Sequence, residues 1–181
     1  MTNQSPMLKI QIERMQAALQ VLTDTPSGYI YIASAYSGSS VMVRHNRYVH
    51  ACAVAWHLSL QALPVYSPIA HGHSISGWTN FDQAQPANSH TSWMQRCAPM
   101  LRGACCLYLA APSTDDDHYA NDESIGVQAE LAYARAVDMP IVRGGPWSKP
   151  SGDDTLSEVI LPTMLATECA KLRAALAQVH A

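Results

Sequence analysis

The chain has 181 residues, of which 48% are hydrophobic and 14% are charged, and this balance predicts one domain with a buried core and excludes extended disorder. The net charge is −3 with the histidines neutral, which excludes the basic surface of proteins that hold long nucleic acids. A small anionic substrate remains compatible with this charge, because two or three local cations are enough to bind it.

The five cysteines form no CxxC pair and no regular framework, and two of them lie in an apolar run over 104–111. We therefore interpret them as reduced core residues of a cytoplasmic protein and not as disulfides or a zinc site. This apolar run is too short to span a membrane, and the N-terminal residues lack a secretory signal pattern. The sequence predicts neither a membrane nor a nucleic acid polymer as a partner.

Hydrophobic spacing in the first third of the chain predicts a helix over 7–22, a strand over 29–33 and a helix over 43–62. Small polar residues over 34–40 predict a loop at the carboxyl end of the strand. The apolar face of the second helix, which we expect to be buried, consists of Val49, Cys52, Ala53, Trp56 and Leu60.

The middle of the chain predicts a second strand over 63–69 that runs into His71-Gly72-His73. An irregular segment over 74–92 follows, and long segments of this kind are often functional. A helix over 93–102 then leads to a third strand over 104–110, which is apolar throughout, as expected when both faces are covered.

The last part of the chain predicts an acidic, turn-rich segment over 112–123 and then a helix that begins at Ser124. A short strand over 140–142 and two helical segments over 156–165 and 167–179 complete the predicted elements.

The alternation of strands and helices predicts an α/β three-layer sandwich of the Rossmann-like (flavodoxin-like) type, with a parallel sheet of four to five strands and helices on both faces. We expect a single domain over 1–181, with its core over 29–143 and peripheral helices over 7–22 and 156–179. Ligands of such sheets bind beyond the carboxyl ends of the strands. The loop segments that follow the strands are therefore expected to lie together at one edge of the sheet.

The segment Ser-Ile-Gly-Val-Gln-Ala-Glu over 124–130 is the strongest candidate for a site. Ser124 suits a helix N-cap, Gly126 would let a ligand approach the backbone, and a helix N-terminus offers free N–H groups to an anion. Glu130 follows in an otherwise apolar stretch, where a carboxylate is costly unless it has a partner or a function. The pattern alone leaves open that Glu130 faces solvent on an amphipathic helix.

The first strand and its loop offer a second candidate region. Tyr31 alternates with isoleucines, so it is either a core residue with a satisfied hydroxyl or a phenol at the edge of the sheet. Ser34, Ser37 and Gly38 form a small-residue segment that suits an anion, although no glycine-rich phosphate motif is present.

Cationic and metal-binding side chains are also candidates. Arg44 and Arg47 begin the second helix, and each is either a phosphate ligand or an ordinary solvated charge. His71-Gly72-His73 lacks a third ligand at a familiar spacing, so we interpret His71 as a pocket group or a structural residue. Asp115-Asp116-Asp117 is typical of a solvated loop. The sequence predicts neither a metal nor a cofactor.

Three segments occur in an order known from one family: Tyr-Ile-Ala-Ser-Ala-Tyr-Ser over 31–37, Ser-Pro-Ile-Ala-His over 67–71, and Ser-x-Gly-Val-x-x-Glu-Leu-Ala over 124–132. Together they resemble the nucleoside 2-deoxyribosyltransferase-like superfamily, and within it the uncharacterised bacterial and phage DUF1937 family. The resemblance extends over about 29–142, and the Gly-Val-x-x-Glu-Leu-Ala segment is its most specific part.

This resemblance implies that Glu130 is a nucleophile, which attacks the anomeric carbon of a nucleoside or nucleotide, expels the base and forms a glycosyl-enzyme. Tyr31 matches the tyrosine that orients this carboxylate. Ser124 and Ser34 match serines that contact the 5′-phosphate in nucleotide N-hydrolases, which favours a nucleoside 5′-monophosphate as substrate. The other predicted substrate-binding residues are Tyr36, Ser37, Gly38, Arg44, His71 and Gly126.

One departure from the superfamily pattern concerns the general acid. An Asp that assists the departing base is usual in the helix before the third strand, but no carboxylate lies around Arg96 and Cys97. We predict that Asp82 in the long loop replaces it, with Asp122 as the alternative. Such assistance is typically worth about 10²–10⁴-fold in rate.

Four functions are therefore compatible with the sequence: an N-glycosidase, which we favour, a base-exchanging deoxyribosyltransferase, a nucleotide sensor without turnover, and a Rossmann-like domain of unrelated role. The resemblance also implies a homodimer or larger homo-oligomer. Apolar residues near the C-terminus would either form that interface or cover the chain's own sheet; they are Leu161, Met164, Leu165, Leu172 and Leu176.

Overall fold

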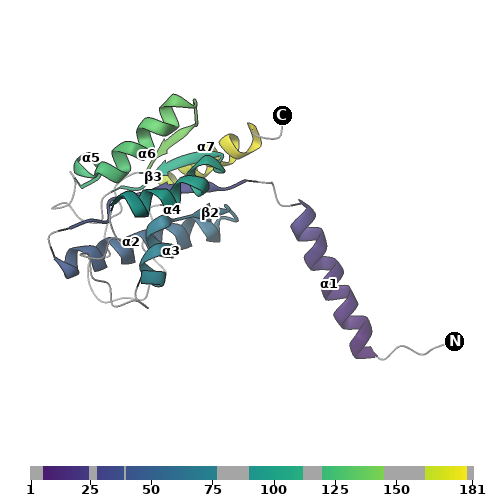
Figure 1. The fold of residues 1–181 in the computed structure, drawn as a ribbon. Helices are drawn as coiled ribbons and strands as arrows, with labels where there is room; N and C mark the ends of the chain where they lie inside the picture. The colour runs from purple at the N-terminus through teal and green to yellow at the C-terminus, as the bar shows by residue number, and fades with distance from the viewer. Residues whose placement is uncertain are drawn as a thin grey trace.

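The computed structural model describes residues 6–24, 28–38, 40–76, 90–111, 120–144 and 162–178. Four parallel strands form one sheet in the order β2-β1-β3-β4 (Figure 1). The strands are β1 (Ile30–Ala33), β2 (Val65–Tyr66), β3 (Cys106–Leu109) and β4 (Ile141–Arg143). This order confirms the predicted α/β architecture, and it places the topological switch point between β1 and β3.

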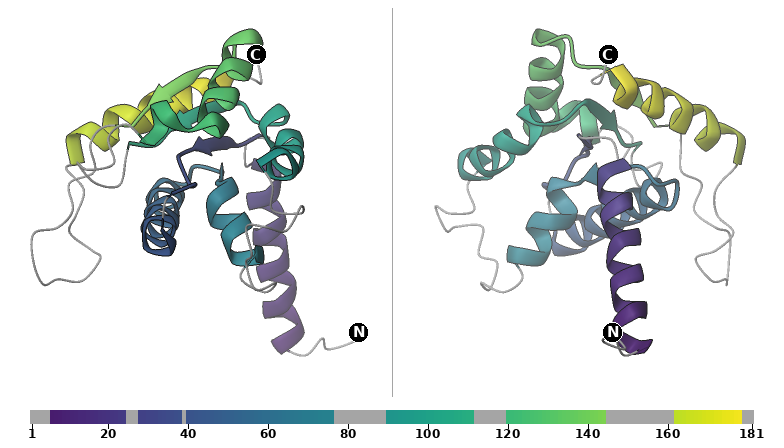
Figure 2. Two further views of the ribbon diagram at one scale, coloured as in Figure 1. Left: turned by 60° about the vertical axis from the view of Figure 1, so that its left-hand side comes forward. Right: turned by 90° about the vertical axis from the view of Figure 1, so that its right-hand side faces the viewer.

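Helices cover both faces of the sheet (Figure 2). They are α2 (Val41–Leu60), α3 (Pro68–Ser76), α4 (His90–Arg102), α5 (Ala120–Glu123), α6 (Ile125–Ala136) and α7 (Pro162–Ala177). Because side chains alternate along a strand, Tyr31 and Leu107 pack with α4 and α6, whereas Ile32 and Tyr108 pack with α2 and α7. A further helix, α1 (Pro6–Asp24), projects away from this assembly (Figure 1).

The second strand is shorter than predicted, because α3 begins at Pro68. Ser67 caps this helix: its Oγ accepts a hydrogen bond from the Ala70 N–H at 3.2 Å, and its carbonyl accepts one from the His71 N–H at 3.0 Å. Proline is favoured at the first helical position, since the N–H that it lacks has no partner there. His71-Gly72-His73 therefore lies on a helix and not in a loop.

The predicted core face of α2 is wrong. Ala51, Val54 and Leu58 are the buried residues of this helix, whereas Trp56 and Leu60 are mainly exposed. The two apolar rows lie on opposite sides of the helix and have similar spacing, so the spacing alone did not distinguish the row that faces the sheet.

The C-terminal helix is part of the core. Cys169, Leu172 and Leu176 of α7 are buried against the sheet, so these two leucines cover the chain's own core. Most of the predicted helix over 156–165 lies outside the described residues. All five cysteines are free, as expected, and three of them are buried. None of the described helices combines the length and apolar character needed to cross a membrane.

Candidate active site

A buried carboxylate on α6 is hydrogen-bonded to a tyrosine of β1. The Tyr31 hydroxyl donates to Oε1 of Glu130 at 2.6 Å, and both residues are buried, with Glu130 only 6% exposed. The neighbouring α6 residues Val127, Leu131 and Ala134 are buried in the apolar core on the same face of the sheet. Glu130 thus has a specific partner and does not face solvent.

The surroundings of Glu130 change its acidity. Burial raises its pKa to about 7, while the hydrogen bond from Tyr31 acts in the opposite direction. Burial and the neighbouring Glu130 carboxylate raise the pKa of Tyr31 far above its usual value, so the phenol stays protonated and remains a donor. A carboxylate that ionises near neutral pH and is held by a fixed donor can act as a nucleophile or as a base.

Cys97 of α4 lies where the departing-base carboxylate was expected. It is buried and lies close enough to Tyr31 for each group to affect the pKa of the other. Burial and the nearby Glu130 raise the pKa of this thiol to about 11, which keeps it uncharged. Within the described residues, Glu130 is the only carboxylate that shifts the pKa of Tyr31 or Cys97. The predicted acid Asp82 lies outside these residues, and its alternative Asp122 is exposed on α5.

Asn121 joins the carboxyl ends of β1 and β3, a role that the sequence analysis missed. Its Oδ1 accepts a hydrogen bond from the Ala35 N–H at 2.9 Å, and its Nδ2 donates to the Ala110 carbonyl at 2.7 Å. The last backbone bond between these strands, from Ala110 N–H to the Ala33 carbonyl, lies immediately before it. The side-chain amide thus continues the ladder at the point where the strands diverge.

The loop after β1 is held by the two arginines of α2. An Arg44 guanidinium nitrogen donates to the Gly38 carbonyl at 3.1 Å, and Arg47 donates to the Ser37 carbonyl. Both side chains therefore position the loop that was predicted to bind an anion. Ser34, at the start of this loop, has a buried Oγ that lacks a hydrogen-bond partner within the described part of the chain.

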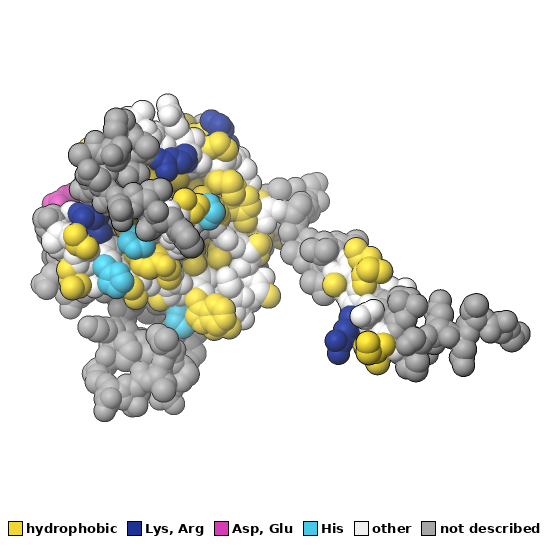
Figure 3. All heavy atoms as spheres, turned by 60° about the horizontal axis from the view of Figure 1, so that its bottom comes forward, with side chains coloured by type: hydrophobic (Ala, Val, Ile, Leu, Met, Phe, Trp, Pro, Cys, Tyr) yellow, Lys and Arg dark blue, Asp and Glu magenta, His cyan; other side chains and the backbone are white. Residues whose placement is uncertain are grey.

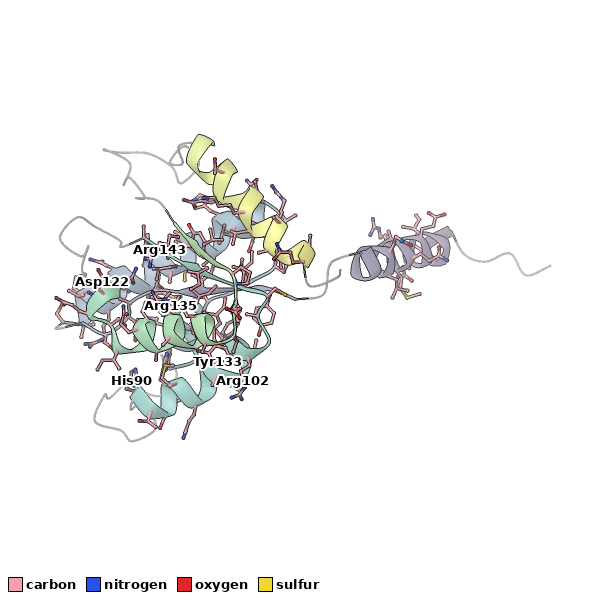
Figure 4. The ribbon with its side chains drawn as sticks, turned by 90° about the horizontal axis from the view of Figure 1, so that it is seen from above. His90, Arg102, Asp122, Tyr133, Arg135 and Arg143 are labelled. Carbon is pink, nitrogen blue, oxygen red and sulfur yellow. The ribbon has the colours of Figure 1, made fainter. Side chains whose placement is uncertain are left out.

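The N-terminus of α6 lies at the same edge of the sheet. Ser124 is the N-cap, as predicted, and its Oγ accepts a hydrogen bond from the Val127 N–H at 3.4 Å. His90 of α4 lies beside Gly126. Figure 4 shows His90 and Asp122 toward one end of these helices and Tyr133 toward the other. The helix N-termini thus gather near the carboxyl ends of the strands.

Four aromatic rings form a cluster at this edge, consisting of Tyr36, Tyr48, His73 and Trp93. The Tyr36 hydroxyl lies 2.7 Å from Nδ1 of His73, and the Tyr36 and Trp93 rings are nearly parallel, with centroids 6.0 Å apart. The Tyr48 and His73 rings stack at 3.9 Å. Burial, aided by His45, lowers the pKa of His73 and favours its neutral form.

The ring cluster adjoins the buried carboxylate through α4. Trp93 and Cys97 are four residues apart, so they lie one turn apart on one side of the helix. Gly72 allows this arrangement, because a Cβ at that position would overlap the Trp93 ring. His71 lies next to Tyr66, with the centroids of their rings 5.7 Å apart, and the Tyr66 ring in turn lies next to that of Tyr31. The spacing of Gly72 and Trp93 in the sequence gave no signal for this contact.

Within the described ranges, no group of three or more His, Cys, Asp or Glu residues is arranged to hold a metal ion. Comparisons of the chain with protein-family models, with curated proteins and with solved structures found no match. The resemblance described above therefore stays a prediction, and the geometry of the site is the main support for a function.

Proposed function

We propose that this protein is an N-glycosidase that cleaves the base–sugar bond of a nucleoside 5′-monophosphate. The observation that carries the proposal is the buried Glu130 carboxylate, which accepts a hydrogen bond from Tyr31 of β1, one of the two strands that flank the switch point of the sheet. Ligands of open parallel sheets bind at such points, and a carboxylate without solvent is costly unless it has a function.

The reaction begins with attack of Glu130 on the anomeric carbon. Tyr31 occupies Oε1, so we assign the attack to Oε2. A bond forms between this oxygen and the anomeric carbon, and the bond to the base nitrogen breaks with its electron pair leaving on the base. Water then attacks the same carbon, and the bond from this carbon to Oε2 breaks with its electron pair returning to the carboxylate. The proton that the water loses replaces the one that the departing base takes up, and the sugar phosphate is released.

The phosphate preference is supported by groups at the same edge. The buried Oγ of Ser34 has no hydrogen-bond partner among the residues that the structure describes, and a phosphate oxygen would supply one. The N-terminus of α6, capped by Ser124, offers backbone N–H groups that favour an anion. Arg44 adds positive charge at the adjacent loop.

The ring cluster supports a planar aromatic leaving group. Tyr36 and Trp93 present nearly parallel rings, and Trp93 lies one helical turn from Cys97, whose pKa Tyr31 influences. Stacking on such rings is worth about 1–3 kcal/mol per nucleobase and depends little on the base. The leaving base also needs a proton, and Asp82 remains the candidate donor.

A nucleotide sensor without turnover is the second candidate. The observation that favours it is the uncharged Cys97 at the position where a proton donor was expected. Base exchange between deoxynucleosides remains a further alternative, because transfer and hydrolysis differ only in what attacks the glycosyl-enzyme.

A base-release assay tests these functions. The protein and its Glu130→Gln variant are incubated with ribo- and deoxynucleosides and their 5′-monophosphates, with and without an acceptor base. We expect free base from a monophosphate, loss of release in Glu130→Gln, and nucleotide affinity kept within about tenfold, since the variant is nearly isosteric. A new nucleoside formed only with acceptor would indicate base exchange.

Glu168→Gln is the matched control, since Glu168 is also buried and also accepts a hydrogen bond from a tyrosine, Tyr108. Equal losses in the two variants would assign the effect to folding and not to chemistry. Nucleotide binding without turnover across the whole panel would favour the sensor.

A further inference from the structure

The outer side of α2 carries an exposed apolar strip. Its members are each half or more exposed and comprise Val41, Met42, Val49, Trp56 and Leu60. At 3.6 residues per turn they fall on one side of the helix, opposite the buried Ala51, Val54 and Leu58. Figure 3, which brings the bottom of Figure 1 forward, shows hydrophobic and histidine side chains on the face that carries α2 and α3. An exposed row of this length is unlike the single apolar residues normally scattered on a protein surface.

The spacing of the strip fits another helix. Met42, His45, Val49, Cys52 and Trp56 follow one another at alternating intervals of three and four residues. This is the repeat by which two helices pack side chains into one another's gaps. The strip also lies outside the segments that surround Glu130, so it is not explained by the proposed function.

Charge favours a second copy of the same helix as the occupant. α2 contains no Asp or Glu, and its two arginines, Arg44 and Arg47, donate to the loop after β1 on another side of the helix. The strip is bordered by uncharged side chains or histidines, among them Asn46, Tyr48 and His57. An uncharged surface is complementary to itself, whereas a charged partner would find no opposite charge on it.

We propose that this strip is a homodimer interface in which α2 packs antiparallel against α2 of a second copy about a two-fold axis. A two-fold contact pairs the same surface on both subunits. Val49 lies midway between Met42 and Trp56 along the helix. Antiparallel packing therefore places the two Val49 side chains together at the axis and sets each Trp56 against Met42 of the other copy. A parallel arrangement would instead place the like ends of the two helix dipoles side by side.

The extent of the strip sets the expected affinity. A 20-residue helix is about 30 Å long and about 10 Å wide, so the strip covers on the order of 300 Å² in projection. Standard interfaces bury about 800 Å² per partner. The strip is smaller than this, so we expect a weak dimer that dissociates in the micromolar range.

Sedimentation velocity of the full chain between about 1 and 200 μM tests the interface. We expect a shift from monomer to dimer across this range, and we expect Val49→Asp to remain monomeric at all concentrations, since two carboxylates would meet at the axis. Val137→Asp is the matched control, because Val137 lies at the end of α6 and is 48% exposed against 50% for Val49. Circular dichroism of both variants checks that each is folded.

A photocrosslinking residue at position 56, in a mixture of ¹⁵N-labelled and unlabelled chains, identifies the contact. We expect crosslinks between chains to the peptide that contains Met42. Crosslinks to α1 of the other copy would overturn the proposed packing and identify a different occupant. A monomer at every concentration, or a dimer that Val49→Asp leaves intact, would overturn the interface itself.

Discussion

Tyr108 and Glu168 form a hydrogen bond of 2.9 Å on the face of the sheet opposite to the Tyr31–Glu130 pair. Tyr108 is paired in register with Ile32, the neighbour of Tyr31, so the two tyrosine–glutamate pairs lie on adjacent strands and point to opposite faces. Each pair joins a central strand to a covering helix. The chain thus contains its own control for the candidate site.

Removal of the Tyr31 hydroxyl should reduce base release without unfolding the protein. A hydrogen bond to a charged group is worth about 1.5–3 kcal/mol, so we expect Tyr31→Phe to lower kcat about 10- to 100-fold. Tyr108→Phe removes the equivalent hydroxyl on the opposite face of the sheet. It should lower the melting temperature while kcat stays unchanged. Equal activity in the two variants would exclude Tyr31 as the residue that orients Glu130.

Base release should increase with pH up to about neutrality. The attacking form of Glu130 is the carboxylate, and its pKa is raised to about 7 by burial. We therefore expect kcat/KM to rise from acidic pH and to level off above about pH 7. Tyr31→Phe removes a bond that favours the charged form, so the midpoint should move to higher pH. A flat profile between pH 5 and 8 would show that Glu130 does not react as a carboxylate.

The same ionisation should make stability depend on pH. The pKa of Glu130 is higher in the folded state than its ordinary value of 4.5, so the folded state binds more protons between about pH 4.5 and 7. The protonated Glu130 side chain contributes fully to the stability of the folded state at low pH. This contribution is lost as the pH rises through this window. Glu130→Gln lacks this loss, and its stability relative to the wild type should increase by on the order of 3 kcal/mol from pH 4.5 to 8. Urea unfolding at both pH values measures the difference, and parallel curves would contradict it.

Asn121→Asp should disturb the edge of the sheet. The substitution keeps the acceptor for the Ala35 N–H but replaces the donor to the Ala110 carbonyl with an oxygen. We expect a loss of about 1–3 kcal/mol of unfolding free energy. The KM for a monophosphate should also increase, because the loop that begins at Ser34 is released. Asn46→Asp, on an exposed position of α2, is the control and should change neither quantity. A change in stability without a change in KM would limit Asn121 to a structural role.

Two glycines should respond in opposite ways to alanine. Gly72→Ala places a methyl group in the Trp93 ring, so it should destabilise the fold and disrupt the ring cluster. The methyl group that Gly126→Ala adds would make only ordinary van der Waals contacts. The variant should therefore stabilise α6 by up to about 1 kcal/mol. If a phosphate binds at the N-terminus of α6, the same variant should also weaken nucleotide binding in calorimetry. Unchanged affinity in Gly126→Ala would contradict a close backbone approach.

The sequence by itself determined the architecture and one end of the candidate site. Apolar runs with flanking caps are local signals, so the order of strands and helices, the parallel sheet and the N-cap Ser124 followed from residues close together in the chain. The apolar stretch around Glu130 indicated that a buried carboxylate needs a partner. The pairing with Tyr31 was expected only from a family resemblance.

The tertiary structure decided what depends on distant contacts. Which apolar row of α2 faces the sheet depends on the strands beneath it, and the row around Trp56 had the same helical spacing as the buried row around Val54. In the sequence, Asn121 is an ordinary polar residue of a turn-rich segment. Its role follows only from the folded sheet, where the diverging strands leave the Ala35 N–H and the Ala110 carbonyl without backbone partners. Spacing along the chain records the period of a helix but not its rotation, and it carries no information about backbone groups that become unpaired only when the sheet forms.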